Sequence, residues 1–191
     1  MTFESKANLV VLVSGRGTNL QALIDAQASG KMRSRIQCVI ANRADAQALD
    51  RAHKAGIPTR VIVSKGRSAV DYNRELKATL LELNPQWIVL AGYMKILPPD
   101  IVDAFVGRMI NIHPSLLPAF PGLHAQQQAL DAGVKITGCT VHDVDGGCDT
   151  GPIIVQKAVA VLPDDDADSL AQRLLKVEHE ALIEAVTILE S

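Results

Sequence analysis

An asparagine and a histidine two positions apart are the first side chains in this sequence whose spacing suggests chemistry. Asn111 and His113 lie in the segment "INIHPSLLPAFPG", at the end of a short apolar run that predicts a strand. Residues i and i+2 of a strand point to the same face, so the amide and the imidazole would face one point. Together they offer N–H donors suited to an oxygen that gains negative charge. The alternative is a turn-forming Asn beside a His that is satisfied by the backbone.

A later loop, "HDVDGGCDTGPII", brings three carboxylates into a short Gly-rich connection: Asp143, Asp145 and Asp149. Calcium binding is one interpretation, but the spacing differs from the EF-hand order. Another is that one Asp reaches across to His113 and stabilises its charged form. An Asp held beside "GPII", where strand structure resumes, would be fixed better than one in the middle of the loop.

The three cysteines, Cys38, Cys139 and Cys148, are odd in number and form no C-x-x-C pair. This usage is typical of a reduced, cytoplasmic setting rather than a disulfide scaffold. Two of them could join His142 as zinc ligands, but no second close pair supports a zinc site.

The turn "SGRGTN" at 14–19 lies between a predicted strand and a predicted helix. Its glycines let the backbone approach a ligand, and a helix N-terminus offers N–H groups to an anion such as phosphate. We expect Thr18 or Asn19 to cap the helix; a capped tight turn without a ligand is the alternative. The dinucleotide fingerprint is incomplete at Leu20, and no acid directly follows Asn42, so NAD binding is disfavoured.

The predicted last helix, 167–189, carries Glu178 on its apolar stripe. A carboxylate there needs a partner, such as a ligand hydroxyl or amine, unless it lies at the edge of the stripe and reaches water. We expect His179 and His53 to be surface residues.

Short β-branched runs alternate with helical patterns along the chain, which predicts an α/β fold. We expect a Rossmann-like three-layer αβα architecture, with a mostly parallel twisted central sheet and a C-terminal strand pair plus helix. The expected strands are 8–14, 36–42, 59–63, 87–92, 108–113, 135–144 and 151–161. The expected helices are 19–28, 44–55, 68–83, 99–105, 124–132 and 167–189.

The composition excludes some classes of function. The 191 residues include 19 Lys and Arg and 21 Asp and Glu, a net charge of −2. No basic stripe is available, so we expect neither nucleic-acid nor membrane-surface binding. No apolar run reaches the roughly 18 residues of a membrane span. The opening "MTFESKANLVVLVSG" has no basic start or cleavage-like site, so we expect no signal peptide.

Four segments in this order resemble the folate-dependent formyltransferase family: "VLVSGRGTNLQALI", "VLAGYMKIL", "INIHPSLLPAFPGLHA" and "HDVDGGCDTGPIIVQ". The similarity runs from about residue 8 to 183, and "FPGLHA" points to the branch that acts on glycinamide ribonucleotide. The resemblance implies formyl transfer from 10-formyltetrahydrofolate, as cosubstrate, to the amine of that ribonucleotide in purine (IMP) biosynthesis. It implies no metal, a monomer or homodimer, and one domain over 1–191. Within it we expect a nucleotide-binding-like part (about 8–107) and a catalytic and folate-binding part (about 108–191).

The resemblance also implies roles for particular residues. The catalytic residues would be Asn111, His113 and Asp149. Gly17, Thr18 and Asn19 would hold the substrate phosphate through their backbone, and Glu178 would contact the ribose or amine. The implied folate contacts are Arg67, Met94, Lys95, Ile96, Leu97, Asn111 and Asp145. Lys95 stands where an Arg is frequent, Leu175 where some relatives are polar, and the spacing around Arg67 departs from the family pattern.

Other functions fit parts of this pattern. A formyltetrahydrofolate hydrolase would be expected to carry an extra N-terminal domain, and a methionyl-tRNA formyltransferase an extra C-terminal one. A non-catalytic module that binds a phosphosugar or nucleotide would use 14–19 but leave Asn111, His113 and Asp149 without a role.

Overall fold

The computed structural model describes residues 7–191. Residues 1–6, on which the expectation of no signal peptide partly rests, lie outside the described part. The strands are β1 (Asn8–Val13), β2 (Arg35–Ala41), β3 (Thr59–Val61), β4 (Trp87–Leu90), β5 (Met109–His113), β6 (Ile136–Asp143) and β7 (Ile153–Ala160). The helices are α1 (Thr18–Ala28), α2 (Gln47–Lys54), α3 (Ala69–Leu83), α4 (Pro99–Ala104), α5 (Ala125–Asp131) and α6 (Ala167–Leu189).

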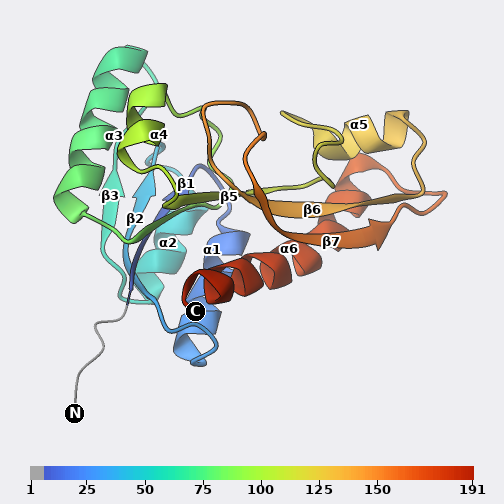
Figure 1. Cartoon of the computed structure of the whole chain (residues 1–191), viewed down its shortest axis with the longest axis horizontal. Helices are drawn as coiled ribbons and strands as arrows, with labels where there is room; N and C mark the ends of the chain where they lie inside the picture. The colour runs from blue at the N-terminus through green and yellow to red at the C-terminus, as the bar shows by residue number, and fades with distance from the viewer. Residues whose placement is uncertain (1–6) are drawn as a thin grey trace.

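The strands form one sheet in the order β3-β2-β1-β4-β5-β6-β7. The pairs from β3 to β5 are parallel, whereas β5–β6 and β6–β7 are antiparallel. Figure 1 shows α3 and α4 beside one face of the parallel part, with α1, α2 and α6 on the other. The predicted three-layer α/β fold with a C-terminal strand pair and helix is confirmed.

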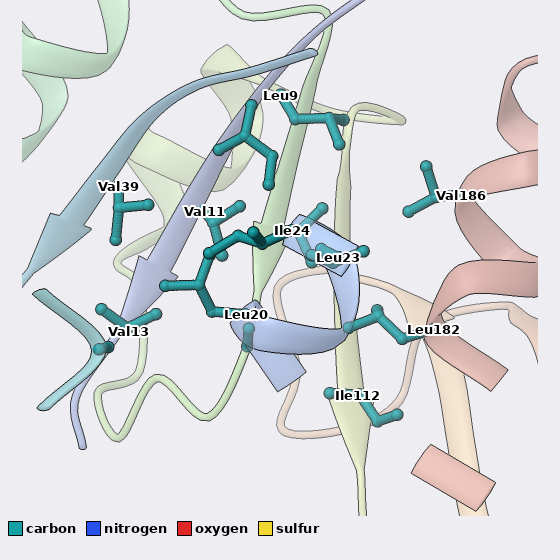
Figure 2. Close-up of a cluster of buried hydrophobic side chains, with 14 of the residues drawn as sticks. Leu9, Val11, Val13, Leu20, Leu23, Ile24, Val39, Ile112, Leu182 and Val186 are labelled. Atoms are coloured by element: carbon teal, nitrogen blue, oxygen red, sulfur yellow. The ribbon is translucent and has the colours of Figure 1, made fainter. Parts of the chain in front are cut away.

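Strand β1 lies at the centre of the sheet and is buried on both faces. Leu9, Val11 and Val13 pack toward α1 and α6, as Figure 2 shows. Val10 and Leu12 pack toward α3 and α4 in a second core. All five side chains are 0% exposed, which explains why the strand reads as a continuous apolar run rather than an alternating one.

The boundaries of the elements differ from the predicted ones by a few residues. Helix α6 has the predicted bounds, whereas α2 begins at Gln47 instead of residue 44. Asp45 pairs with Arg43 in the turn before it, and Ala46 is extended, so the helix cannot start earlier.

Two expectations about local structure are wrong. Neither Thr18 nor Asn19 caps α1: the N-cap is Gly17, in the left-handed region with φ of 72°, and no side chain caps the helix. The side chain of Asn19 binds elsewhere in the site. His179 is half-buried rather than a free surface residue: its Nε2 is buried, has no hydrogen-bond partner within residues 7–191, and burial lowers its pKa. His53 is exposed, as expected.

No helix within residues 7–191 is both long and apolar enough to cross a membrane.

The pairing of β6 with β7 depends on a glycine. A Cβ on Gly138 would overlap the carbonyl oxygen of Lys157 and lie 2.7 Å from Cδ2 of Leu116. We expect Gly138→Ala to lower the free energy of unfolding by about 2–3 kcal/mol, because the obstacle is backbone that cannot move aside. Urea unfolding measures this effect. Gly146→Ala is the matched control, since no heavy atom lies within 4 Å of the added Cβ; equal loss in both variants would contradict the prediction.

Candidate active site

The end of β5 presents Asn111 and His113 on one face of the sheet. Ile110 and Ile112 point to the other face, into the core with α1 and α6. The strand ends at His113, because Pro114 has no N–H to continue the ladder. The alternation read from the sequence therefore places the amide and the imidazole side by side at the carboxyl edge of a parallel strand, where open α/β sheets bind ligands.

The carboxylate of Asp149 lies between these two side chains. Its Oδ2 is 3.2 Å from Nδ1 of His113. Its Oδ1 accepts a hydrogen bond from Nδ2 of Asn111 at 3.4 Å. The backbone N–H of Gly122 also donates to Oδ2, at 2.8 Å. Residues as far as 38 positions away in the sequence thus meet at the Asp149 carboxylate.

Both ring nitrogens of His113 face acceptors. Nδ1 faces the Asp149 carboxylate, and Nε2 lies 2.9 Å from the carbonyl oxygen of Phe120. A doubly protonated ring can donate to both, whereas a neutral ring can donate to only one of them. The backbone-bonded histidine considered as the alternative is thus present together with the Asp–His contact.

The surroundings of Asp149 favour its ionised form. Its pKa is lowered to about 2, chiefly by the nearby His142 imidazole, with further contributions from the Gly122 N–H and the charge of His113. Burial acts in the opposite direction but is outweighed. The group is a carboxylate throughout the physiological pH range.

His142 is a member of this cluster that the sequence reasoning considered only as a zinc ligand. It lies opposite Asn111 in the β5–β6 register and is 3% exposed. Its Nδ1 is 2.8 Å from the carbonyl oxygen of Asp143, and its Nε2 is 3.6 Å from Oδ1 of Asp149. The proposed zinc set is not assembled: Cys139 is in the core, and residues 7–191 contain no group of three or more metal-ligating side chains close enough to share an ion.

The turn after β1 has the geometry of an anion site. Helix α1 makes its first backbone bond from Gln21 to the carbonyl oxygen of Gly17. The N–H groups of Gly17, Thr18 and Asn19 therefore precede the hydrogen-bonded part of the helix. Gly17 is required here by its positive φ and by space, since a Cβ would lie 2.6 Å from Cβ of Ala48.

Glu178 is buried on α6, and its carboxylate has a protein partner. Nδ2 of Asn19 donates to its Oε2 at 3.0 Å. Burial raises the pKa of Glu178, and the bond from Asn19 partly offsets this effect. The side-chain oxygens of Asn19 and Asn42 are buried and have no partner among the described residues, so both remain available to a bound ligand.

A cavity of about 990 Å³ joins these features. The 14–19 turn and Glu178 line one part of it, and Leu175 also contributes to the wall. Ile112 and Pro114, the residues on either side of His113, line another part. The Asn–His–Asp cluster therefore lies beside the wall of this cavity, behind the end of β5.

The segment expected to contact folate divides into two pairs. Met94 and Lys95 line the cavity, and the ammonium group of Lys95 lies 5.0 Å from the ring centroid of Tyr72. Ile96 is 80% exposed and lies outside the lining, whereas the side chain of Leu97 packs into the core with α3 and α4. Only backbone groups of Leu97 could therefore face a ligand.

Two further residues expected to bind folate interact within the protein. Arg67 pairs with Glu75 at 2.6 Å and does not line the cavity. Lys65, two positions earlier in the chain, does line it. Asp145 accepts hydrogen bonds within its own loop, including one from Oγ1 of Thr150 at 2.7 Å. Asp145 is in the same loop as Asp149, but its side chain bonds to Gly147 and Thr150 rather than to the Asn–His–Asp cluster.

An open α/β sheet with an anion-binding turn beside an amide, an imidazole and a carboxylate has the parts of a group-transfer enzyme. The chain belongs to the formyl transferase family, whose sequence model matches residues 7–186. The family resemblance seen in the four sequence segments is confirmed.

Particular relatives act in purine synthesis. The chain is 43% identical over 173 residues to the phosphoribosylglycinamide formyltransferase of Escherichia coli strain K12, covering 90% of this chain and 82% of the relative. It is 48% identical over 192 residues to the trifunctional purine biosynthetic protein adenosine-3 of Drosophila melanogaster, but spans only 14% of that protein's length. Glycinamide ribonucleotide transformylase 1 from Symbiobacterium toebii has a similar structure, with a TM-score of 0.93, 44% identity, and coverage of 97% of this chain and 89% of that one.

The proximity of His142 leads to a prediction about Asp149. Replacing His142 with Leu should raise the pKa of the Asp149 carboxyl above about 2, because an imidazole close to the carboxylate is lost. In a carboxyl ¹³C NMR titration, Asp149 of the variant should therefore titrate at a higher pH than Asp149 of the unaltered protein. His53→Leu, at an exposed site, is the control.

The same shift has a consequence for stability. A carboxyl whose pKa is lowered on folding contributes stability above its unfolded pKa and loses it as the pH falls through the folded one. For Asp149 that window lies between about pH 4 and pH 2.

Identical Asp149 titrations in the His142→Leu variant and the unaltered protein would show that His142 does not lower the pKa of this carboxyl.

Proposed function

We propose that this protein transfers the formyl group of 10-formyltetrahydrofolate to the amine of glycinamide ribonucleotide, giving formylglycinamide ribonucleotide. The observation that carries the proposal is the pairing of two sites along one carboxyl edge of the sheet. An anion-binding turn follows β1, and a cluster of donors around a carboxylate lies at the end of β5, with one cavity reaching from the turn to the residues that flank His113. Membership of the formyl transferase family supports it.

The turn would hold the phosphate of the ribonucleotide. The free N–H groups of Gly17, Thr18 and Asn19 and the positive end of α1 favour a dianion at this position. Glu178 would receive the ribose hydroxyls or the amine. Among the described residues only Asn19 donates a hydrogen bond to its carboxylate, so Glu178 retains acceptor capacity for the substrate.

The donor cluster would act on the formyl group. When the amine attacks the formyl carbon, the carbonyl oxygen becomes an oxyanion, and Asn111 and His113 would donate to it. His113 Nε2 is held by the carbonyl of Phe120 in the structure, so this bond must exchange for one to the substrate. Asp149 would hold the imidazolium from the other side and order a water molecule that moves the amine proton. His113 could then protonate the departing folate nitrogen.

The folate would bind along 94–97 and the 145–149 loop. Met94 and Ile96 are exposed apolar side chains, 67% and 80% accessible, and Met94 lines the cavity, which suits a flat ring that is apolar on its faces. Lys95 would supply a positive charge in place of the arginine frequent in the family. Arg67 is a weaker candidate, because Glu75 already neutralises it.

We also infer a cytoplasmic setting, which the free thiols of Cys38, Cys139 and Cys148 support. A monomer or homodimer, with a nucleotide-binding-like part to about residue 107 and a catalytic part from about 108, remains part of the proposal. β5, the first strand of the second part, carries both Asn111 and His113.

The decisive assay mixes the protein with glycinamide ribonucleotide and a 10-formylfolate and follows the deformylated folate by absorbance. Release that requires the ribonucleotide supports the proposal. Release without it would indicate a formyltetrahydrofolate hydrolase, and no release would indicate a binding module.

In this assay, His113→Ala and Asn111→Ala should each lower kcat by about 10²–10³, because each removes a donor to the oxyanion. The exposed His53→Ala variant controls for the loss of an imidazole elsewhere. Turnover of His113→Ala at the rate of the unaltered enzyme would refute the assignment of this residue.

A further inference from the structure

Helix α2 contacts three consecutive residues of the anion-binding turn from outside the cavity. The N–H of Ala48 donates to the carbonyl oxygen of Gly15 at 3.1 Å. Nε of Arg51 donates to the carbonyl oxygen of Arg16 at 2.8 Å. Gly17 lies so close to Ala48 that a Cβ would be 2.7 Å from its Cα. The turn is therefore held from behind along its whole length.

These bonds determine where the amides of the turn point. In a trans peptide the C=O of one residue and the N–H of the next point in opposite directions. With the carbonyl of Arg16 held by Arg51, the N–H of Gly17 must point away from α2. The carbonyl held by Ala48 turns the N–H of Arg16 away in the same manner. The N–H groups of the turn thus point toward the cavity only while the carbonyl groups of Gly15 and Arg16 are hydrogen-bonded to α2 on the other side.

Arg51 is the side chain that makes this link. Besides Arg16, its Nη1 donates to Oε1 of Gln21 on α1 at 3.2 Å, so one planar group joins α2, the turn and the first turn of α1. Arg51 does not line the large cavity; it borders a smaller one, of about 470 Å³, on the opposite side of the turn. It can therefore act on a bound anion only through the turn or through its distant charge.

We propose that Arg51 is a positioning residue that holds the 15–19 turn in its anion-binding conformation. The inference rests on the proposed function, because it assigns the phosphate of the substrate to this turn. An arginine suits the role better than a lysine, since its fixed fork reaches two acceptors on different elements at once, whereas an ammonium group is a single point.

Two variants separate geometry from charge. Arg51→Met removes both hydrogen bonds and keeps the apolar stem, and Arg51→Lys keeps the charge but not the fork. With the folate saturating, we expect the KM for glycinamide ribonucleotide to rise about tenfold in Arg51→Met and about threefold in Arg51→Lys. The kcat, the KM for folate and the melting temperature should remain close to those of the unaltered protein. Lys54→Gln removes a charge from the same helix without touching the turn and should change none of these values.

Inorganic phosphate tests the turn without relying on turnover. In ¹H–¹⁵N NMR titrations of the unaltered protein, phosphate should shift the amide signals of Gly17, Thr18 and Asn19. The apparent Kd should be about tenfold weaker in Arg51→Met. If the unaltered protein shows these shifts but no formyl transfer, the proposed function fails and the role of Arg51 stands.

Several results would overturn the role of Arg51. One is phosphate binding of equal strength in Arg51→Met and the unaltered protein. Another is an Arg51→Lys variant with an unchanged ribonucleotide KM, combined with a rise of this KM in Lys54→Gln as large as that in Arg51→Met. This combination would show that charge alone matters. A fall in kcat without a change in the ribonucleotide KM, or an unaltered protein whose turn amides do not respond to phosphate, would also refute it.

Discussion

Strand β1 must be covered on both faces, and much of the molecule follows from that constraint. Because every side chain from Leu9 to Val13 is fully buried, helices have to pack on each side of the sheet. The chain leaves the carboxyl end of β1 through a turn whose Gly17 packs directly on α2. Burial of the strand thus brings three things to one point: the end of β1, the start of α1 and the face of α2 that supports the turn.

The second half of the site depends on a change of direction within the sheet. β5 is parallel to β4 but antiparallel to β6. Strand β6 therefore runs back alongside β5. The register places His142 opposite Asn111. The loop after β6 then returns Asp149 to the same place. A purely parallel continuation would have required a long crossover and would not have brought these groups together.

The parts of the site that the sequence reveals are those set by local periodicity. The i, i+2 spacing on β5 predicts the shared face of Asn111 and His113, and the helical stripe marks Glu178 as a carboxylate that needs a partner unless it reaches water. The identity of that partner, Asn19, is set by the packing of α1 on α6 and has no local signal. The contact of His142 with this cluster could not be predicted for the same kind of reason, because it depends on the register between β5 and β6. Arg67 shows the reverse error, since its side chain is neutralised by Glu75 of α3, eight residues further along the chain.

The polar groups of the donor cluster are satisfied by loops, and this has a physical reason. Buried donors and acceptors without partners cost about 1–3 kcal/mol each, so His113 and Asp149 cannot wait unpaired for a substrate. The carbonyl of Phe120 and the N–H of Gly122, on the loop after β5, provide those partners. A ligand that takes the place of the Phe120 carbonyl exchanges one hydrogen bond for another and loses little in the ground state. It gains when its oxygen becomes charged, because a bond to an anion is stronger than a bond to a neutral carbonyl. In the proposed reaction, exchange of the Phe120 carbonyl for the substrate oxygen would therefore favour the charged state over the uncharged one.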